Sequence, residues 1–317
     1  MTAGKTVAAV DCGTNSIRLL IGAIEEDGAL REITRENTIV RLGQGVDATG
    51  RLAPEAIERT REALAAYVDR MEAEGVSAVR MVATSATRDA SNRDDFFDMT
   101  AELLGRIQDG AQAEVISGEE EAELSFKGAT LDIDSDRGPF CVIDLGGGST
   151  EFIVGTAAGE ILGAYSTQMG CVRLTERILR SDPPTGEETS EARGYVDKQM
   201  AEAAETVPVP QAATFVGCAG TFTTLSALAQ DLDYYDPERI HMSNIPFARM
   251  REITGWLRSA TAKERAANPV VHPGRADVIG SGSVIVEQMM TAFEAHGAES
   301  FVISEKDILD GIVAGLI

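Results

Sequence analysis

The sequence predicts an α/β protein built from two similar domains with a cleft between them. Three observations lead to this prediction. The chain has 317 residues, which suits two domains better than one; strand-like and helix-like segments alternate along it; and one strand–turn–strand unit occurs twice. Hydrophobic residues make up 44% of the chain and charged residues 25%, which is typical of a globular protein.

The repeated unit consists of a buried strand, a turn of small residues and a second strand. The first copy reads VAAVDCGTNSIRLLIG and begins at Val7. The second copy reads FCVIDLGGGSTEFIVG and begins at Phe140. In each copy an aspartate, Asp11 or Asp144, opens the turn. The repetition indicates a duplicated domain and places the cleft between its two copies.

Between the two copies the residue pattern is that of mixed α/β structure. A helix is expected over 54–74, with a proline in its first turn and Gly75 just past its end. A strand is expected over 79–83. Residues 117–120 match a capping box, which predicts a helix that begins there and runs to about Lys127.

The second half shows the same alternation. A strand over 214–218 is expected to lead into a glycine turn and then a helix from about Thr221. A glycine-rich cluster over 279–283 precedes a further apolar helix. The chain ends with a strand over 301–303 and a helix from Asp307. The apolar face of that last helix consists of Ile308, Leu309, Ile312, Val313 and Leu316.

The charge balance limits the partners of the protein. The chain carries 28 Lys and Arg residues against 51 Asp and Glu residues, a net charge of −23. Such a surface repels nucleic acid and anionic membranes, so we expect neither as a partner. No apolar run approaches the roughly 20 residues that span a bilayer, and the N-terminus lacks the apolar core of a signal peptide. We therefore expect a cytoplasmic protein.

Cysteine and histidine chemistry finds little support in the sequence. The four cysteines form no CxxC pair, which favours buried reduced thiols over a disulfide or a zinc site. The three histidines are scattered and lack the spacing of metal ligands. These residues are Cys12, Cys141, Cys171, Cys218, His241, His272 and His296.

The small residues of the repeated turns are expected to bind phosphate. Consecutive small residues in a tight turn can aim several backbone N–H groups at one anion, because no side chain blocks the approach. A single glycine turn could equally be an ordinary hairpin, but two matched turns and a third glycine loop favour phosphate binding. The candidate phosphate-binding residues of the turns are Gly13, Thr14, Asn15, Ser16, Gly146, Gly147, Gly148 and Ser149, and those of the third loop are Gly220 and Thr221.

Three acidic residues are candidates for holding a divalent cation: Asp11, Asp144 and Glu151. An aspartate beside a phosphate-binding turn can hold Mg²⁺, often through water, and so offset the phosphate charge. The alternative is that the aspartate only caps the turn. We favour the cation for Asp144 and Glu151, and we leave both interpretations open for Asp11.

Acidic residues crowd the first turn of the helix that begins near residue 118. They are Glu119, Glu120, Glu121 and Glu123. Because the helix macrodipole favours acids at this end, the pattern alone does not select a catalytic base among them.

Three arginines follow predicted strand or turn segments: Arg88, Arg173 and Arg275. The guanidinium fork can contact phosphate, but a surface arginine at the start of a helix is a more ordinary feature. The residues alone favour an ordinary surface arginine and assign no role to any of the three.

Taken together, these stretches resemble one known family, that of the exopolyphosphatases and guanosine pentaphosphate phosphohydrolases, within the actin-like ATPase superfold. The resemblance covers nearly the whole chain and keeps the family's order. It is carried by residues 11–20, 84–92, 117–122, 144–151, 170–177 and 217–225. It implies two ribonuclease-H-like domains, over 1–125 and 126–304, with a C-terminal helix over 305–317 that packs back on the first domain.

The resemblance also implies roles for individual residues. The family's catalytic glutamate stands immediately before the alanine of a Ser-Gly-x-Glu-Glu-Ala motif, which corresponds to Glu121 in this sequence. The family's phosphate-binding arginine corresponds to Arg88, and its acidic pair around the glycine turn corresponds to Asp144 and Glu151. The implied cofactor is Mg²⁺ or Mn²⁺, and the implied assembly is a homodimer.

The implied reaction is attack of water on a terminal phosphoryl group, with Glu121 as general base. Some members carry a long C-terminal extension that this sequence lacks, so we expect release of orthophosphate from short inorganic polyphosphate. Conversion of guanosine pentaphosphate to the tetraphosphate is the alternative. An acceptor-dependent kinase of the same superfold is a less favoured interpretation. A silent sensor of guanosine tetra- or pentaphosphate is also less favoured, because Glu121, Asp144 and Glu151 are all present.

Overall fold

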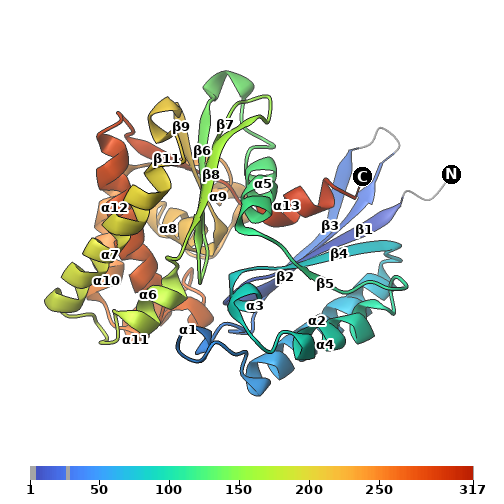
Figure 1. The fold of residues 1–317 in the computed structure, drawn as a ribbon. Helices are drawn as coiled ribbons and strands as arrows, with labels where there is room; N and C mark the ends of the chain where they lie inside the picture. Colours follow the sequence, from blue (N-terminus) through green and yellow to red (C-terminus); the bar gives the residue numbers. More distant parts are fainter. Residues whose placement is uncertain (1–4, 26–28, 317) are drawn as a thin grey trace. The chain divides into compact units, whose positions relative to one another are not determined.

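A computed structural model describes residues 5–25 and 29–316 of the chain. The chain divides into two compact units. Unit 1 comprises Met1–Leu124 together with Ile308–Ile317, and unit 2 comprises Ser125–Asp307. Each unit is a mixed β-sheet covered by helices (Figure 1).

The sheet of unit 1 has five strands in the order β3-β2-β1-β4-β5. β1 pairs antiparallel with β2 and parallel with β4; β2–β3 is antiparallel and β4–β5 is parallel. The central strand β1 is almost wholly buried, which explains its continuous run of apolar residues. The strands are β1 Thr6–Cys12, β2 Ser16–Ile24, β3 Leu30–Ile39, β4 Ala78–Ala83 and β5 Ala113–Val115.

Helices cover both faces of this sheet (Figure 1). α2 (Pro54–Ala73) and α4 (Asp94–Leu104) pack on one face, and α13 (Ile308–Val313) packs on the other. The expected helix over 54–74 is confirmed: Pro54 is its first residue, and Gly75 follows it in the left-handed conformation with φ +67°. Two short helices, α1 (Val46–Thr49) and α3 (Ser85–Asp89), complete the unit.

The sheet of unit 2 has six strands in the order β10-β11-β9-β6-β7-β8. Its run β8-β7-β6-β9-β11 repeats the order and the directions of the unit 1 run β3-β2-β1-β4-β5. β10 is an added antiparallel edge strand. The duplication that the sequence predicts is therefore confirmed at the level of sheet topology. The strands are β6 Phe140–Leu145, β7 Thr150–Gly155, β8 Ile161–Thr167, β9 Thr214–Cys218, β10 Ser243–Pro246 and β11 Ser300–Ile303.

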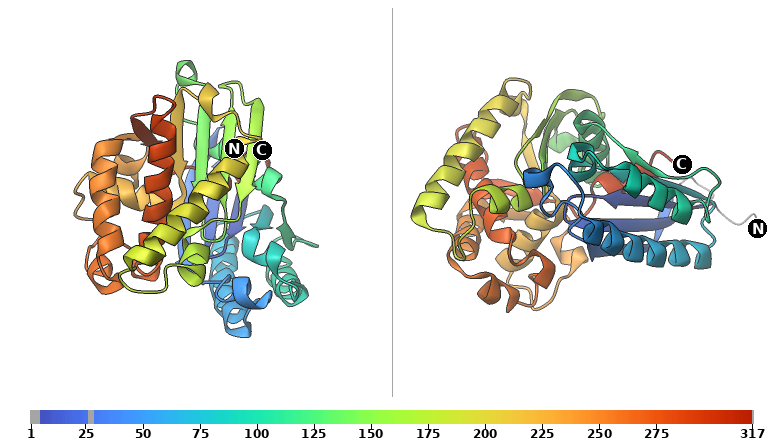
Figure 2. Two further views of the ribbon diagram at one scale, coloured as in Figure 1. Left: turned by 60° about the vertical axis from the view of Figure 1, so that its left-hand side comes forward. Right: turned by 60° about the horizontal axis from the view of Figure 1, so that its bottom comes forward.

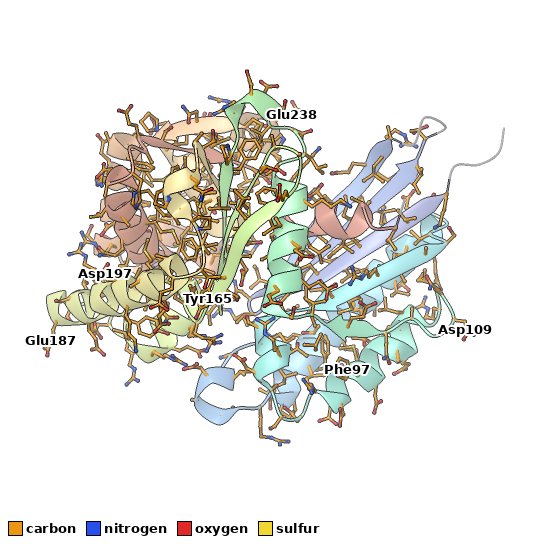
Figure 3. The ribbon with its side chains drawn as sticks, turned by 45° about the horizontal axis from the view of Figure 1, so that its top comes forward. Phe97, Asp109, Tyr165, Glu187, Asp197 and Glu238 are labelled. Carbon is orange, nitrogen blue, oxygen red and sulfur yellow. The ribbon has the colours of Figure 1, made fainter. Side chains whose placement is uncertain are left out.

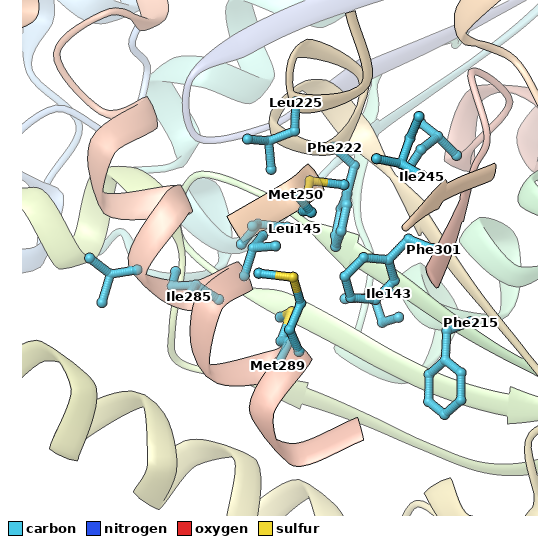
Figure 4. Packing of buried hydrophobic residues seen from close by; sticks show 14 of the residues in the cluster. Ile143, Leu145, Phe215, Phe222, Leu225, Ile245, Met250, Ile285, Met289 and Phe301 are labelled. Atoms are coloured by element: carbon cyan, nitrogen blue, oxygen red, sulfur yellow. The ribbon is translucent and has the colours of Figure 1, made fainter. Parts of the chain in front are cut away.

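The main core of unit 2 lies between its sheet and a layer of helices in which α12 packs beside α7 and α10 (Figure 2). Figure 4 shows Ile143 of β6, Phe222 of α8 and Phe301 of β11 in this core; the rings of Phe222 and Phe301 meet edge to face with centroids 5.1 Å apart. The helices are α5 Gly118–Ala129, which crosses from unit 1, α6 Cys171–Arg177, α7 Gly186–Ala204, α8 Ala219–Ala229, α9 Pro237–Ile240, α10 Phe247–Ser259, α11 Ala262–Ala266 and α12 Ile279–Glu294.

Two expected loops are instead helical. The helix after β9 begins at Ala219, so that Gly220 and Thr221 lie in the first turn of α8 and no separate glycine turn precedes it. Ala219 makes this sharp join in the left-handed conformation, with φ 65°. The glycine-rich cluster over 279–283 forms the start of α12; a Cβ at Gly282 would lie 2.8 Å from Thr221 Cγ2, so a small residue is needed for α12 to approach α8.

Many of the acidic residues that give the chain its negative charge lie at the surface. Asp109, Glu187, Asp197 and Glu238 are exposed and extend from the ribbon in Figure 3. Among the described residues, no helix is both long and apolar enough to cross a membrane. The four cysteines are free and buried, as the sequence predicts.

Candidate active site

The two predicted phosphate turns close with the same backbone hydrogen bond. In unit 1 the N–H of Gly13 donates to the carbonyl of Ser16 at 3.0 Å. In unit 2 the N–H of Gly146 donates to the carbonyl of Ser149 at 3.1 Å. The two turns join equivalent strands, β1 to β2 and β6 to β7, although Ser16 is already the first residue of β2. The resemblance between the turns therefore extends from the sequence to the backbone.

In unit 2, N–H groups of α6 hold the glycine turn by donating hydrogen bonds to the carbonyl groups of the turn. The carbonyl of Gly146 accepts from the N–H of Cys171 at 3.1 Å. That of Gly147 accepts from Val172 and Arg173 at 2.9 and 3.0 Å. Arg173 also donates from Nε to the carbonyl of Gly148 at 2.7 Å. This contact gives Arg173, which sequence reasoning left open, a structural role in fixing the turn.

The hydrogen bonds to α6 determine where the N–H groups of the turn point. Within one planar peptide the carbonyl and the following N–H point in opposite directions. The carbonyls of Gly146 and Gly147 face α6, so the N–H groups of Gly147 and Gly148 point away from it. Neither N–H donates a hydrogen bond within the part of the chain that the structure describes. The turn thus offers adjacent donors of the kind that bind phosphate.

The close approach of α6 depends on Gly170. A Cβ at this position would overlap the carbonyl group of Gly147 and lie 2.6 Å from the nitrogen of Gly148. Sequence reasoning missed Gly170 as a site residue, because a glycine before a helix is too common to single out.

The turn of unit 1 is held in a similar way by the segment that follows β3. The carbonyl of Asn15 accepts from the N–H groups of Val40 and Arg41 at 3.1 and 2.9 Å, and that of Thr14 accepts from Gly43 at 2.8 Å. The hydroxyl of Thr14 also shares a hydrogen bond of 2.8 Å with Ser85.

The acidic residues at these turns lie in the strands rather than in the turns themselves. Asp11 is in β1 opposite Arg18 of β2, and Asp144 is in β6 opposite Glu151 of β7. The expectation that each aspartate opens its turn is therefore wrong by about two residues, because both strands continue past it. Cross-strand partners share one face of the sheet, so each aspartate lies beside the partner's side chain.

The two equivalent strand positions carry opposite charges. Arg18 donates from Nε and Nη2 to Oδ2 of Asp11, at 3.0 and 2.7 Å. In unit 2 the residue in the place of Arg18 is Glu151, and both Asp144 and Glu151 are buried. The carboxylate of Asp11 thus has a cation supplied by the chain, whereas Asp144 faces a second carboxylate. A role for Asp11 as a metal ligand stays a prediction.

The pair Asp144 and Glu151 could hold a divalent cation such as Mg²⁺. Two buried carboxylates side by side repel each other unless a cation or a proton separates them. Among the described residues, no group of three or more His, Cys, Asp and Glu side chains could hold a metal ion. Mg²⁺ commonly uses only one or two carboxylates and completes its shell with water and phosphate oxygens, so this donor set fits it.

The structure distinguishes Glu121 from the other acids of α5. Glu119 and Glu123 are exposed, whereas Glu120 pairs with Arg80 at 2.6 Å. Glu121 is buried, and its Oε2 accepts from Nη1 of Arg88 at 3.1 Å. The sequence could not reveal this difference, because Arg88 comes from α3.

The helix that carries Glu121 begins as predicted. Ser117 Oγ accepts from the N–H of Glu120 at 3.1 Å, which is the N-cap bond expected from the capping box. The carboxylate of Glu120 binds Arg80 rather than serving only as a cap.

Arg275 lies against the third predicted phosphate segment. Its guanidinium occupies the space that a Cβ at Gly220 would fill. Gly220 lies in the first turn of α8, whose N–H groups and dipole favour an anion. The structure thus brings together Arg275 and Gly220, which the sequence singled out separately.

Cys171 begins α6 and donates from its N–H to the carbonyl of Gly146 in the glycine turn. Burial raises the pKa of Cys171 to about 11, and the positive charge of Arg275 offsets only part of this effect. Burial likewise raises the pKa of Cys141 to about 12. Both thiols are therefore protonated at neutral pH, which disfavours a cysteine nucleophile.

Comparison with known proteins agrees with this description. Residues 21–315 match the model of the Ppx/GppA phosphatase family. The chain is 54% identical to Exopolyphosphatase 2 of Mycobacterium tuberculosis over 314 residues, which cover 98% of each chain. A solved exopolyphosphatase-like protein shares 40% identity and a TM-score of 0.90, with 98% of each chain covered.

A solved Ppx/GppA family member from Aquifex aeolicus shares 30% identity and a TM-score of 0.77, covering 98% of this chain and 97% of that one. The predicted fold class is therefore confirmed. The two helix-covered mixed β-sheets match the actin-like ATPase fold of these phosphatases. The match to the family model and the near full-length match to a relative at 54% identity show that the chain belongs to the Ppx/GppA phosphatase family.

Proposed function

We propose that the protein is an exopolyphosphatase, which releases terminal orthophosphate from inorganic polyphosphate, with short chains as the expected substrates. The observation that carries the proposal is its 54% identity, over nearly the full length, to a relative named Exopolyphosphatase 2. The matched turns support it, because a substrate made only of phosphates calls for repeated phosphate-binding elements and little else.

Phosphate binding in this protein works locally. A net charge of −23 repels a polyanion at long range, so backbone N–H groups and a few arginines supply the attraction. In unit 2 these groups are the N–H groups of Gly147 and Gly148, with Arg275 beside Gly220. We propose that the matched turn of unit 1 also binds phosphate.

We propose Mg²⁺, with Mn²⁺ as a substitute, as the cofactor held by Asp144 and Glu151. When bound, the cation supplies positive charge that offsets the charge of the phosphate oxygens. Ligation by these two carboxylates alone leaves coordination positions for water and substrate.

Glu121 is the proposed general base. It orients the attacking water and takes its proton, while the leaving group, itself a phosphate, needs little acid assistance. Arg88 holds the carboxylate of Glu121 and stabilises charge on the transferring phosphoryl group. The protonated state of the buried thiols supports direct attack by water over a covalent cysteine intermediate.

The test is phosphate release with Mg²⁺ from short polyphosphate, long polyphosphate, guanosine pentaphosphate and ATP, measured side by side. The proposal expects the highest kcat/KM with short polyphosphate and loss of activity with EDTA. A clear preference for guanosine pentaphosphate would make that nucleotide the substrate in place of polyphosphate. Phosphate release from none of the four compounds would defeat the proposal. Release from ATP only with an added acceptor would indicate a kinase.

Two further expectations remain proposals: a homodimer and a cytoplasmic location. Light scattering coupled to size-exclusion chromatography tests the first, and fractionation of the source cells tests the second.

A further inference from the structure

We infer that Ser125 and Ser166 position the carboxylates of Asp144 and Glu151 and thereby set the affinity of the site for a divalent cation. The inference deepens the proposed function and rests on its cation site. It assigns the serines a positioning role, since each acts through the carboxylate that it holds.

Ser125 holds Asp144 from the helix that covers this face of the sheet. Its Oγ donates to Oδ2 of Asp144 at 2.6 Å, and the serine is fully buried. The next residue of α5, Phe126, packs so closely on β7 that a Cβ at Gly155 would lie 2.9 Å from its ring atom Cε2. The helix is therefore pressed against the strands, and the serine hydroxyl has little freedom to turn elsewhere.

Ser166 holds Glu151 from the neighbouring strand. It lies on β8 directly opposite Glu151, and its Oγ donates to Oε1 at 2.7 Å. Asp144, Glu151 and Ser166 thus form one cross-strand row over β6, β7 and β8. The two hydroxyls approach the acidic pair from different elements, one from the helix and one along the sheet.

Serine hydroxyls suit a cation site because they orient a carboxylate without neutralising it. Hydrogen bonds from a hydroxyl to an ionised carboxylate are short and strong, as both distances here indicate. They fix the rotamers of two like charges that would otherwise turn apart. In the equivalent row of unit 1, Arg18 both orients and neutralises Asp11, which leaves less need for an added cation.

Direct binding of Mn²⁺ to the substrate-free protein, measured by electron paramagnetic resonance and calorimetry, tests the inference. Loss of a group that orients a metal ligand commonly weakens metal binding by about 10- to 100-fold. We expect this increase in Kd for Ser125→Ala and for Ser166→Ala, and loss of binding for Asp144→Asn. Ser283→Ala is the matched control, because Ser283 is buried and donates only locally, to the carbonyl of Ile279 at 3.0 Å.

Thermal unfolding without metal shows whether each variant is folded. Ser166 lies on an edge strand and is partly exposed, so its variant keeps the test valid if Ser125→Ala does not fold. If the wild-type protein and Asp144→Asn bind Mn²⁺ with the same affinity, the cation site itself is overturned, and the inference with it. A second result would overturn the inference alone. In it, Asp144→Asn abolishes Mn²⁺ binding, but both serine variants are folded and bind Mn²⁺ with the wild-type Kd.

Discussion

Arg88 donates from Nη1 both to Oε2 of Glu121, at 3.1 Å, and to the carbonyl of Ile116, at 3.0 Å. Within the described residues these are the only hydrogen bonds of its side chain, so Nε and Nη2 are available to a phosphate oxygen. One guanidinium can therefore hold the proposed base and contact the phosphoryl group at the same time. In the proposed mechanism, this relationship would link substrate binding to the orientation of Glu121.

The first prediction concerns the geometry of Arg88. Arg88→Lys keeps the charge, but an ammonium group is a point donor and lacks the planar fork that serves several acceptors. We expect kcat for phosphate release to fall at least about tenfold, as for loss of one oriented charge-stabilising contact. Arg93→Lys, at an exposed position, is the control and should retain wild-type rates. Unchanged kcat in Arg88→Lys would show that the fork is dispensable.

The second prediction separates two neighbouring acids. Glu121→Gln keeps the shape of the side chain but cannot take a proton, so kcat should fall by about 10²- to 10⁴-fold. Glu120→Gln should leave kcat nearly unchanged and cost at most about 1 kcal/mol of stability, because it weakens a partly exposed ion pair with Arg80. Steady-state phosphate release and chemical denaturation measure both effects. Near-normal turnover by Glu121→Gln would remove it as the base.

The third prediction concerns pH and Asp132. Partial burial raises the pKa of Asp132. Hydrogen bonds from Lys306 and His241 lower the pKa by more than burial raises it, so the pKa lies below its ordinary value of 3.8. An acid whose pKa is depressed by folding stabilises the fold above its unfolded pKa and loses this contribution as the pH falls through the folded pKa. Asp132→Asn should therefore lower Tm near neutral pH, where Asp132 is ionised in both the folded and the unfolded chain.

The same difference in Tm should shrink as the pH falls below about 4, where the unfolded chain begins to bind the proton. Scanning calorimetry of both proteins from pH 3 to pH 8 measures it. A difference in Tm that grows as the pH falls below about 4 would contradict the assigned direction of the pKa shift.

The duplicated α/β organisation could be predicted from the residues, because its signals lie close together along the chain. The two copies of the strand–turn–strand unit are continuous segments, and their strands are buried enough to appear as apolar runs. The hairpins around Gly13 and Gly146 and the cap at Ser117 are local, and the structure places them as expected. What the sequence could not show is Ala219 at φ 65°, since a left-handed alanine leaves no mark in the residue pattern.

The site was predicted only in outline, because its distinguishing contacts join distant residues. Four acids in one helix turn look alike until Arg88, 33 positions away, is seen to bind Glu121. Ser125 and Ser166 are ordinary serines in the sequence, and only the packing of α5 and the register of β8 bring them to Asp144 and Glu151. The pairing of Arg18 with Asp11 likewise cannot be recognised before the register of β1 and β2 is known.

The last prediction concerns the contact of α13 with the helix that carries Glu121. A Cβ at Gly311 would overlap the carbonyl oxygen of Leu124 and lie 2.8 Å from its carbonyl carbon. Backbone cannot give way as a flexible side chain can, so Gly311→Ala must displace α13 or α5. We expect a loss of about 1–3 kcal/mol of stability. Leu124 lies one turn after Glu121, so kcat should fall more than KM changes.

Gly255→Ala is the matched control for this change. Gly255 also lies within a helix, α10, and a Cβ there would meet nothing within 4 Å. Alanine at such a site should be neutral or should stabilise the protein by about 0.5–1 kcal/mol, because it restricts the unfolded chain. Denaturant unfolding and steady-state kinetics of the two variants give the comparison. A folded Gly311→Ala protein with wild-type kcat would show that the base tolerates movement of α5, and that α13 contributes to stability alone.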